Sequence, residues 1–309
     1  DHECSMTPPR DISRRHFVRD VTALSLSGSL LSGCSRIPAP GAAATNAGSG
    51  ARAVRPAVNG IGLQLYTVSD QLRADFDGTI EKVAQIGYTQ VEFAGYSGKT
   101  PEQVRALLDR FKLRAPSSHI GMDLLRRDLE AQIQIAQTIG HEYITLPSLG
   151  RSETPMHTVD AWKRVADECN TMGQTLRGRG LRFAFHSHTA EFVDVGGGET
   201  GMDVFVSETD AAVFNFQMDL GWARVANQDP VAWFTRYPNR FRMWHVKDML
   251  NSRPTMVGLG DVNFKPTFAA WKASGMEYFF VEQDGAASAP GGSLAAIATS
   301  YENLRKLLA

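Results

Sequence analysis

The stretch that decides the fold runs from Phe214 to Asp219 and reads Phe-Asn-Phe-Gln-Met-Asp. In an extended strand, successive side chains point to opposite faces. The two phenylalanines and the methionine therefore share one face, which suits packing under helices. Asn215, Gln217 and Asp219 share the other face. We expect this polar face to point toward the axis of a closed sheet.

Seven further apolar segments flank this stretch, and each is followed by a helical pattern. The expected strands are 61–66, 90–94, 114–119, 143–147, 182–188, 214–219, 242–247 and 278–282. The expected helices are 76–86, one opening at 100–103, 128–139, 158–176, 202–208, 230–237, 264–274 and 294–308. Gly87 is a normal residue for ending the first helix, and Thr100 to Gln103 form a capping box with a proline at the first helical position.

Strict alternation of strand and helix predicts a parallel sheet, because each parallel crossover needs a connecting helix. Eight units within residues 58–309 favour closure into a (β/α)₈ TIM barrel, which typically takes about 250 residues. An open doubly wound sheet is the alternative. No Gly-x-Gly-x-x-Gly follows the first strand, so nothing in the sequence indicates a dinucleotide.

The first 57 residues are expected to form an export signal followed by a disordered tether. Residues 13–18 form a twin-arginine pattern, residues 21–31 are apolar, and residues 31–34 resemble a bacterial lipobox ending in Cys34. We therefore expect a signal peptide over 1–33, lipidation of Cys34, and a disordered tether over 34–57. The protein would be exported and held by lipid at the periplasmic face of a bacterial membrane. A secretory signal with an incidental cysteine is the alternative.

Composition limits the classes of partner. The formal net charge is -1 and 21% of residues are charged, so no global field would attract nucleic acid or an acidic membrane surface. Three cysteines are too few for a disulfide framework.

Four successive expected strands deliver an ionisable side chain to one rim. These residues are Glu191, Asp219, His245 and Glu282. Burying three carboxylates together without a cation is costly, because like charges and desolvation both raise their pKa values. A divalent metal resolves that cost, and oxygen ligands with one imidazole suit Mn²⁺, Mg²⁺, Co²⁺ or Zn²⁺.

Each of these residues also has a simpler interpretation. Asp219 can be the N-cap of the next helix, His245 a structural histidine, and Glu191 a solvated loop charge. Lys247 shares the face of His245 and can polarise a substrate carbonyl. It can equally form a salt bridge to Glu92 or Asp248.

Several motifs together resemble the xylose isomerase-like barrel superfamily, in its sugar phosphate isomerase/epimerase branch. The motifs are residues 61–66, 91–93, 186–192, 218–221, 245–248, 258–260 and 281–282. The resemblance covers residues 60 to 308, and the segments at His186 and His245 are the specific ones. Ser187 stands where the family's His-Asn-His motif has asparagine, which puts the neighbouring hydrogen bonds in doubt.

The resemblance implies a metal site and an acid/base pair. One divalent ion, Mn²⁺ first, is expected on Glu191, Asp219, His245 and Glu282, where it would act as a Lewis acid and stabilise an enediolate. Glu191 and Glu282 are expected to exchange the proton, with Lys247 as a third catalytic group. The expected substrate contacts are His186, His188, Glu92, His119 and Trp222.

The first function that follows is isomerisation or epimerisation of a keto-sugar or polyol. The second is β-elimination by a lyase or hydratase acting on keto-glycosides or keto-polyols with the same residues. An AP endonuclease would need three metals and a basic face, and a non-catalytic sugar-binding lipoprotein would bind metal without proton exchange. The expected partner is a small carbohydrate, without nucleic acid. Membrane contact would be only through the lipid anchor, and a homo-oligomer is left open.

Overall fold

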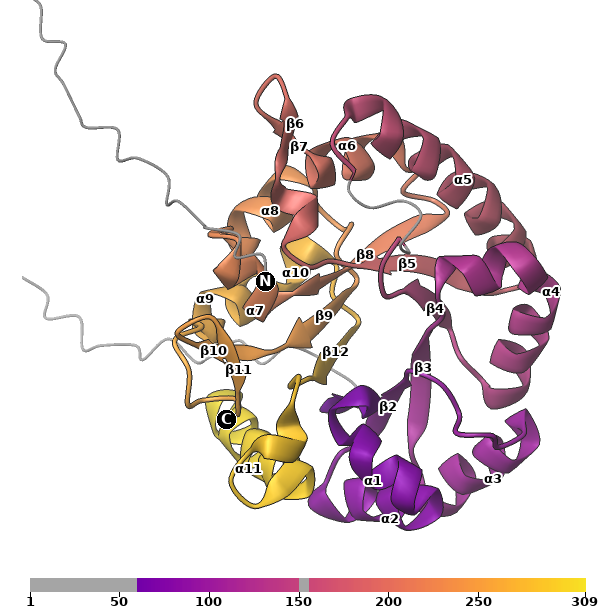
Figure 1. Ribbon diagram of the computed structural model, residues 1–309, viewed down its shortest axis with the longest axis vertical. Coiled ribbons are helices and arrows are strands. Elements are labelled where there is room, and N and C mark those ends of the chain that lie inside the picture. The colour runs from indigo at the N-terminus through magenta and orange to yellow at the C-terminus, as the bar shows by residue number, and fades with distance from the viewer. Residues whose placement is uncertain (1–59, 150–155) are drawn as a thin grey trace, which may run out of the picture. The chain divides into compact units, whose positions relative to one another are not determined.

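A computed structural model describes residues 60–149 and 156–309. Within these residues, eight parallel strands close into a barrel in the order β1-β12-β9-β8-β5-β4-β3-β2, and helices surround it (Figure 1). The expected TIM barrel is therefore confirmed, and the open sheet is excluded. The expected signal peptide, Cys34 and the tether lie outside the described residues.

The barrel strands are short, and β3, β5 and β8 end in His119, His186 and Asp219. The eight strands are β1 (Gly62–Gln64), β2 (Gln90–Phe93), β3 (Arg114–His119), β4 (Tyr143–Leu146), β5 (Arg182–His186), β8 (Phe214–Asp219), β9 (Met243–Val246) and β12 (Tyr278–Val281). In the register of the sheet, His186 pairs with Gln217, and His245 pairs with both Asp219 and Phe280. The sheet register thus places these polar side chains near one level of the barrel.

The helices and small hairpins fill the connections. The helices are α1 (Ser69–Ala74), α2 (Phe76–Ile86), α3 (Pro101–Phe111), α4 (Met122–Ile139), α5 (Val159–Gly178), α6 (Gly201–Glu208), α7 (Leu220–Val225), α8 (Pro230–Arg236), α9 (Phe264–Ala269), α10 (Trp271–Ser274) and α11 (Gly292–Leu307). The 3₁₀ turns are η1 (Leu65–Val68), η2 (Ala190–Phe192) and η3 (Ala286–Ser288), and the hairpins are β6 (Asp194–Gly196) with β7 (Glu199–Thr200), and β10 (Asp248–Leu250) with β11 (Arg253–Thr255).

Local capping signals in the sequence match the structure. Thr100 and Gln103 form the expected reciprocal capping box at the start of α3. Gly87 ends α2 with a φ of 120°, a left-handed conformation that glycine adopts without a steric penalty.

Helix α4 begins earlier than the sequence pattern predicted. The helix was expected to start at Asp128, but it starts at Met122 and has a break at Asp128, where φ is −156°. Asp128 accepts a hydrogen bond from the backbone nitrogen of Ala131 at 3.1 Å. Asp128 is therefore an N-cap inside a kinked helix, which explains why its sequence signal was read as the helix start.

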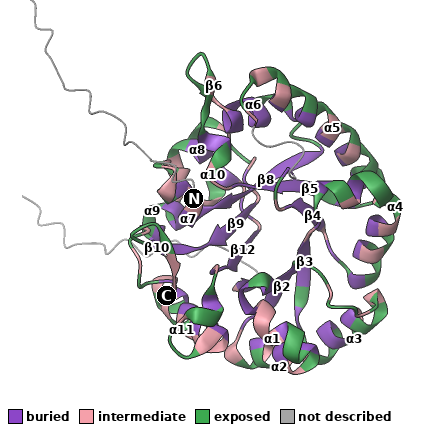
Figure 2. Ribbon diagram, viewed as in Figure 1, coloured by how far each residue is buried: buried purple, intermediate pink, exposed green. Residues whose placement is uncertain are grey.

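The apolar interior has two parts. A large cluster lies between the strands and the surrounding helices, and the strands are buried along their length (Figure 2). A smaller cluster of Tyr143, Ala184, Met243, Tyr278 and Phe280 fills the inside of the barrel. These apolar side chains lie below His186, His245 and Asp219, which occupy the carboxyl ends of the strands.

None of the helices in the described residues combines the length and apolar character needed to cross a bilayer.

Candidate active site

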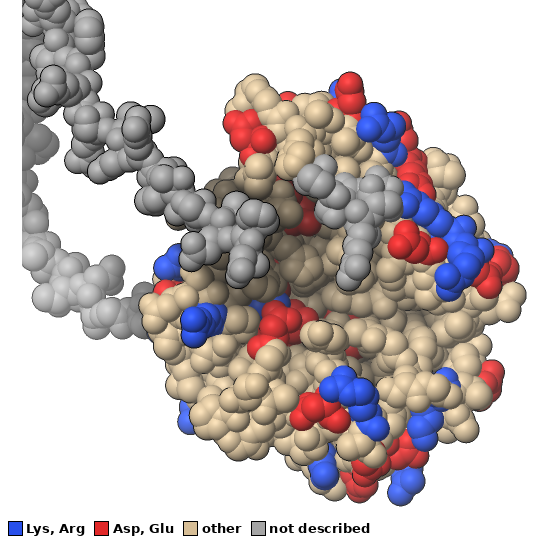
Figure 3. Space-filling model, viewed as in Figure 1, with Lys and Arg blue, Asp and Glu red and all other residues tan. Residues whose placement is uncertain are grey.

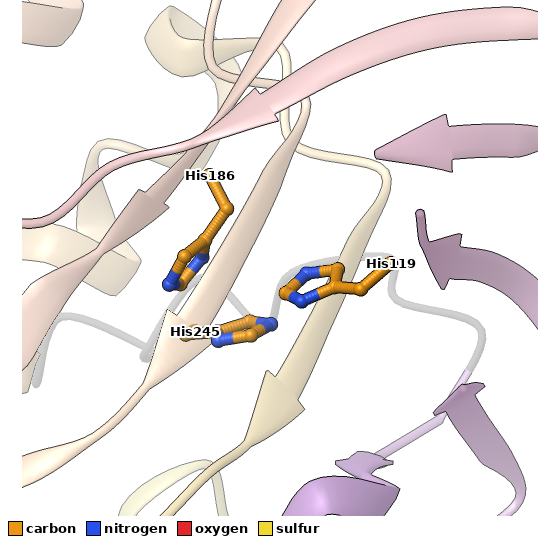
Figure 4. Close-up of side chains that lie close together, drawn as sticks. All are labelled: His119, His186 and His245. Atoms are coloured by element: carbon orange, nitrogen blue, oxygen red, sulfur yellow. The ribbon is translucent and has the colours of Figure 1, made fainter. Parts of the chain in front are cut away.

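Three histidines from separate strands meet at the carboxyl end of the barrel (Figure 4). His119 ends β3, His186 ends β5, and His245 lies in β9. The ring centroid of His186 lies 4.3 Å from that of His245, and the centroid of His119 lies 5.3 Å from that of His245. Imidazoles this close and this buried can share a single cation.

Two carboxylates join two of these histidines in a tighter group. His186, Asp219, His245 and Glu282 each offer a ligand atom, and these atoms lie within 4.8 Å of one another. All four residues are buried. Two nitrogen and two oxygen donors at this spacing form a plausible metal-binding group, which we call the four-ligand group.

Gln217 fixes the orientation of the histidines. Its Oε1 lies 3.0 Å from Nδ1 of His186 and 2.9 Å from Nε2 of His119. An amide oxygen only accepts hydrogen bonds, so Nδ1 of His186 must carry the proton. Burial lowers the pKa of His186 well below its usual value, so the ring is neutral. Its Nε2 therefore has a free lone pair, 3.8 Å from Oδ2 of Asp219.

Asp219 combines two roles that the sequence left as alternatives. Its Oδ1 accepts a hydrogen bond from the backbone nitrogen of Trp222 at 2.8 Å and so caps α7. Its Oδ2 is buried and forms no hydrogen bond among the described residues, but Nζ of Lys247 lies 3.0 Å away as an ion-pair partner. A buried carboxylate oxygen is costly without positive charge beside it, so Oδ2 is suited to a cation.

His245 lies between two carboxylates. Its Nδ1 is 2.7 Å from Oε2 of Glu282, and its Nε2 is 2.6 Å from Oε2 of Glu92. Burial alone would lower the pKa of His245, but these two carboxylates outweigh burial and raise the pKa to about 10. Without another cation, the imidazolium of His245 therefore supplies positive charge to the group.

Lys247 also has carboxylate partners, but not those suggested by the sequence. Its Nζ lies 3.0 Å from Asp219, 3.0 Å from Glu282 and 2.7 Å from Asp284. Burial would lower its pKa, but the three carboxylates raise it, so the ammonium stays charged. Asp248, one of the expected partners, instead accepts backbone hydrogen bonds from Met249, Gly258, Gly260 and Val262.

The balance of buried charge fits a divalent metal. Glu92, Asp219 and Glu282 are three buried carboxylates, and Lys247 is the one buried ammonium among them. If His186 and His245 are neutral ligands, two negative charges remain without compensation. A divalent ion would neutralise both charges and would give Oδ2 of Asp219 a second cationic partner beside Lys247.

Glu191 was expected among the ligands, but the structure does not bring it into the four-ligand group. It lies in η2, beyond the end of β5, and its Oε2 accepts a hydrogen bond from the backbone nitrogen of His188 at 2.8 Å. His186, at the end of the strand itself, takes the position in the group.

The expected substrate contacts differ in their surroundings. Glu92 is fully buried under His245, and the pKa of its carboxyl is about 2, because His119 and His245 outweigh the effect of burial. Its carboxylate contacts the side chains of Gln64, Gln217 and His245. The ring of Trp222 lies 4.9 Å from Nζ of Lys247. His119 and His188 both line the cavity described next.

A cavity of about 450 Å³ opens above the four-ligand group. Its lining residues are Tyr66, Ala94, His119, Pro147, Ser148, His186, His188, Glu282 and Asp284. The hollow is visible at the centre of the face in Figure 3, where basic and acidic side chains alternate around the periphery. The cavity joins polar groups to the proposed metal position, as a small polar substrate would require.

Sequence reasoning missed two residues that organise this site. Gln217 was expected to face the barrel axis, but its role between His119 and His186 was not foreseen. Asp284 was not considered as a partner of Lys247, although it lies only two residues after Glu282. For both residues, the available signal was the two-residue spacing from a neighbour already expected in the site, because side chains two apart in an extended segment share a face.

The fold and the site define a barrel protein with a candidate metal-binding group at the carboxyl ends of its strands. Residues 80–307 match the xylose isomerase-like TIM barrel family, and the chain belongs to that family.

Related proteins give this assignment more detail. The chain is 23% identical over 255 residues to an inosose dehydratase of Lacticaseibacillus casei, covering 70% of this chain and 85% of that protein. A crystal structure of a sugar phosphate isomerase/epimerase from Parabacteroides distasonis has 25% identity and a TM-score of 0.70, covering 85% of this chain and 98% of that one. The IOLI protein with a bound zinc atom has 9% identity and a TM-score of 0.65, covering 81% and 98%.

Proposed function

We propose that this protein is a metal-dependent lyase that removes water or an alcohol from a keto-sugar or keto-polyol. The observation that carries the proposal is the four-ligand group of His186, Asp219, His245 and Glu282 beneath an open polar cavity. The donor set of two imidazoles and two carboxylates suits Mn²⁺ or Zn²⁺. A bound divalent ion would supply Lewis acidity to a carbonyl oxygen of the substrate.

The residues of the chain would carry the proton transfers. Glu282 lines the cavity, and its pKa is lowered because His245 and Lys247 outweigh burial, so it is ionised and can accept a proton from the carbon next to the carbonyl. Elimination would then form a carbon–carbon double bond as the leaving oxygen departs with the proton that Glu282 has accepted. Burial lowers the pKa of His188, on the cavity wall, to about 4, so its neutral ring would donate a hydrogen bond to the leaving oxygen.

Lys247 would hold the carboxylates in place. Its ammonium contacts both Asp219 and Glu282, which fixes two members of the four-ligand group before substrate arrives. Such a preorganised site needs little rearrangement during the reaction.

Elimination is favoured over epimerisation by the position of Glu191. Epimerisation with two glutamates needs one carboxylate on each face of the substrate. Glu282 lines the cavity, whereas Glu191 lies in η2 and is not among the cavity's lining residues. The inosose dehydratase from Lacticaseibacillus casei, whose name states a loss of water, supports the same reaction class.

An isomerase or epimerase remains the second candidate. It is supported by the likeness to the sugar phosphate isomerase/epimerase of Parabacteroides distasonis. His119 and His188 also lie on the same cavity as Glu282 and offer alternative positions for returning the proton.

Product mass separates the two reactions. The full chain is stripped with a chelator, reloaded with Mn²⁺ or Zn²⁺, and incubated with a panel of keto-sugars, keto-polyols and keto-glycosides. We expect a product lighter by one water or one alcohol, formed only with metal present. A product of unchanged mass would replace the lyase with an isomerase. Metal binding without any conversion or solvent proton exchange would contradict both reactions.

We also propose that the protein is exported and lipid-anchored through Cys34. The support is the order of the twin-arginine pattern, the apolar stretch and the lipobox-like ending in the sequence. In a bacterial host, Cys34→Ala should move the protein from the membrane fraction to the soluble fraction. The same membrane association in both forms would contradict the anchor.

A further inference from the structure

A second cavity lies beside the first. It has a volume of about 360 Å³, and its walls are mainly apolar. Leu149, Met156, Trp162 and Val193 contribute most of the apolar side chains among the described lining residues. The rest of the described lining consists of Ser148, His157, His188, Ala190 and Glu191.

The two cavities share a wall. Ser148 and His188 line both the polar cavity above the four-ligand group and the apolar cavity. A single molecule that spans this wall would therefore place a polar part near Glu282 and an apolar part against Trp162 and Leu149.

Glu191 supplies the acidic group of the second cavity. It is 7% exposed, and its Oε2 accepts the backbone hydrogen bond from His188, the residue on the shared wall. Glu191 therefore lies close to the junction between the two cavities, where a polar atom linking the two parts of a ligand would pass. Burial also raises the pKa of its carboxyl above the usual value.

We propose that the second cavity binds an apolar substituent, aromatic in the first instance, that is joined through oxygen to the sugar ring held in the first cavity. The inference rests on the proposed function for the identity of the ring. The volume is adequate, since an apolar cavity of about 150 Å³ already holds benzene. The substrate class is therefore a keto-glycoside with an apolar aglycone, and Glu191 is a positioning residue at the linking oxygen.

Binding of two glucosides tests the subsite without turnover. Calorimetry on the metal-loaded full chain compares phenyl β-D-glucoside with methyl β-D-glucoside. We expect the phenyl compound to bind about tenfold tighter or more, because its ring leaves water for an apolar cavity. Phenol alone, the second probe, should also bind.

Replacing each of three exposed alanines by phenylalanine, one at a time, provides matched variants. Ala190→Phe would fill the second cavity and should remove both the phenyl preference and phenol binding, leaving methyl glucoside unchanged. Ala94→Phe would fill the first cavity and should weaken both glucosides. Ala287→Phe, in η3, lines neither cavity and should change none of the three affinities.

The outcomes separate the subsite from the reaction. Equal affinity for the two glucosides, failure to bind phenol, or a phenyl preference that survives Ala190→Phe would overturn the subsite. A phenyl preference that Ala190→Phe removes supports the subsite even if no keto-glycoside is converted. Lack of conversion would then count against the proposed lyase alone.

Discussion

At the scale of single residues, the chemistry depends on which side chains can reach one cation. His186 has a neutral ring whose Nδ1 is held by Gln217, so its Nε2 is available as a ligand. Glu191 is hydrogen-bonded to the backbone of His188 instead. These two residues are five positions apart, and we expect only the substitution of His186 to weaken metal binding.

Metal affinity is therefore expected to distinguish His186→Ala from Glu191→Gln. Loss of His186 removes a donor from the four-ligand group, and affinity should fall at least as far as for loss of an outer hydrogen-bond partner, about 10–100-fold. Glu191→Gln should bind metal like the native chain. Titration with Mn²⁺ or Zn²⁺ measures both. A reversed order would restore Glu191 as the ligand and exclude His186.

Turnover is expected to depend on the carboxylate of Glu282. Glu282→Gln keeps the size of the side chain but removes the group that accepts the proton, so conversion of the keto-substrate should fall by about 10²-fold or more. The thermal unfolding profile should show that the variant is folded. Activity close to the native value would remove Glu282 from the reaction.

At the scale of elements, helix α7 must approach β9 closely for Lys247 to reach its partners. A Cβ atom on Gly221 would lie 2.9 Å from both Cγ and the backbone oxygen of Lys247. Glycine at this position therefore allows the first turn of α7 to pack against the chain at Lys247. Asp219 starts the same helix as its N-cap, so the cap and the site share one residue.

Gly221→Ala is expected to destabilise the protein and disturb the site. Overpacking at a backbone contact typically costs about 1–3 kcal/mol in the free energy of unfolding, and displacement of Lys247 should also lower metal affinity. Gly178→Ala, at the end of α5 with open space around it, is the matched control and should be close to neutral. Denaturant unfolding of both variants makes the comparison, and equal stability would argue against a tight contact at Gly221.

Strand elements were more predictable than the connections between them. The segments 114–119 and 214–219 were expected with the bounds that the structure shows, because strand alternation carries a clear signal. The segment after His186 was expected to continue to His188 as strand, but it turns into η2. In that turn the backbone nitrogen of His188 donates a hydrogen bond to Glu191, and Glu191 lies outside the four-ligand group.

The register of the sheet is the signal that brings His186 into the candidate group. Parallel neighbours place His186 beside Gln217 and Asp219 beside His245, so these strand ends lie near one level of the barrel. Asp219, His245 and Glu282 follow from the sequence because each lies at or near a strand end. Glu191 lies five residues beyond β5, where strand periodicity no longer applies.

At the scale of the whole molecule, buried neutral histidines make stability depend on pH. His141 is buried, its Nδ1 lies 2.6 Å from the backbone oxygen of Ala115, and its Nε2 lies 3.0 Å from the hydroxyl of Tyr96. Burial lowers its pKa to about 4. Between that value and about 6.5, the unfolded chain therefore binds more protons than the folded protein.

Stability should consequently fall as pH drops from 7 to 5. His141 alone is expected to lower the free energy of unfolding by about 2 kcal/mol over this interval. His141→Gln should lose this part of the pH dependence, and His157→Gln, at an exposed position, is the control. Denaturant unfolding at pH 5 and pH 7 measures the difference. A native protein equally stable at both values would show that His141 can charge freely.

The barrel as a whole concentrates its polar chemistry at one end. The apolar cluster around Tyr143 and Phe280 fills the other half of the interior, and ion pairs of Glu277 with Arg182 and Arg242 lie near the amino-terminal ends of the strands. This arrangement leaves the carboxyl-terminal half to the metal group and its two adjoining cavities.

Anomalous diffraction from crystals of the zinc-loaded protein tests the central claim most directly. The account predicts one zinc peak at the barrel mouth, within about 2.0–2.2 Å of donor atoms from His186, Asp219, His245 and Glu282. A peak bonded to Glu191 in place of His186, or no ordered zinc at this end of the barrel, would contradict it.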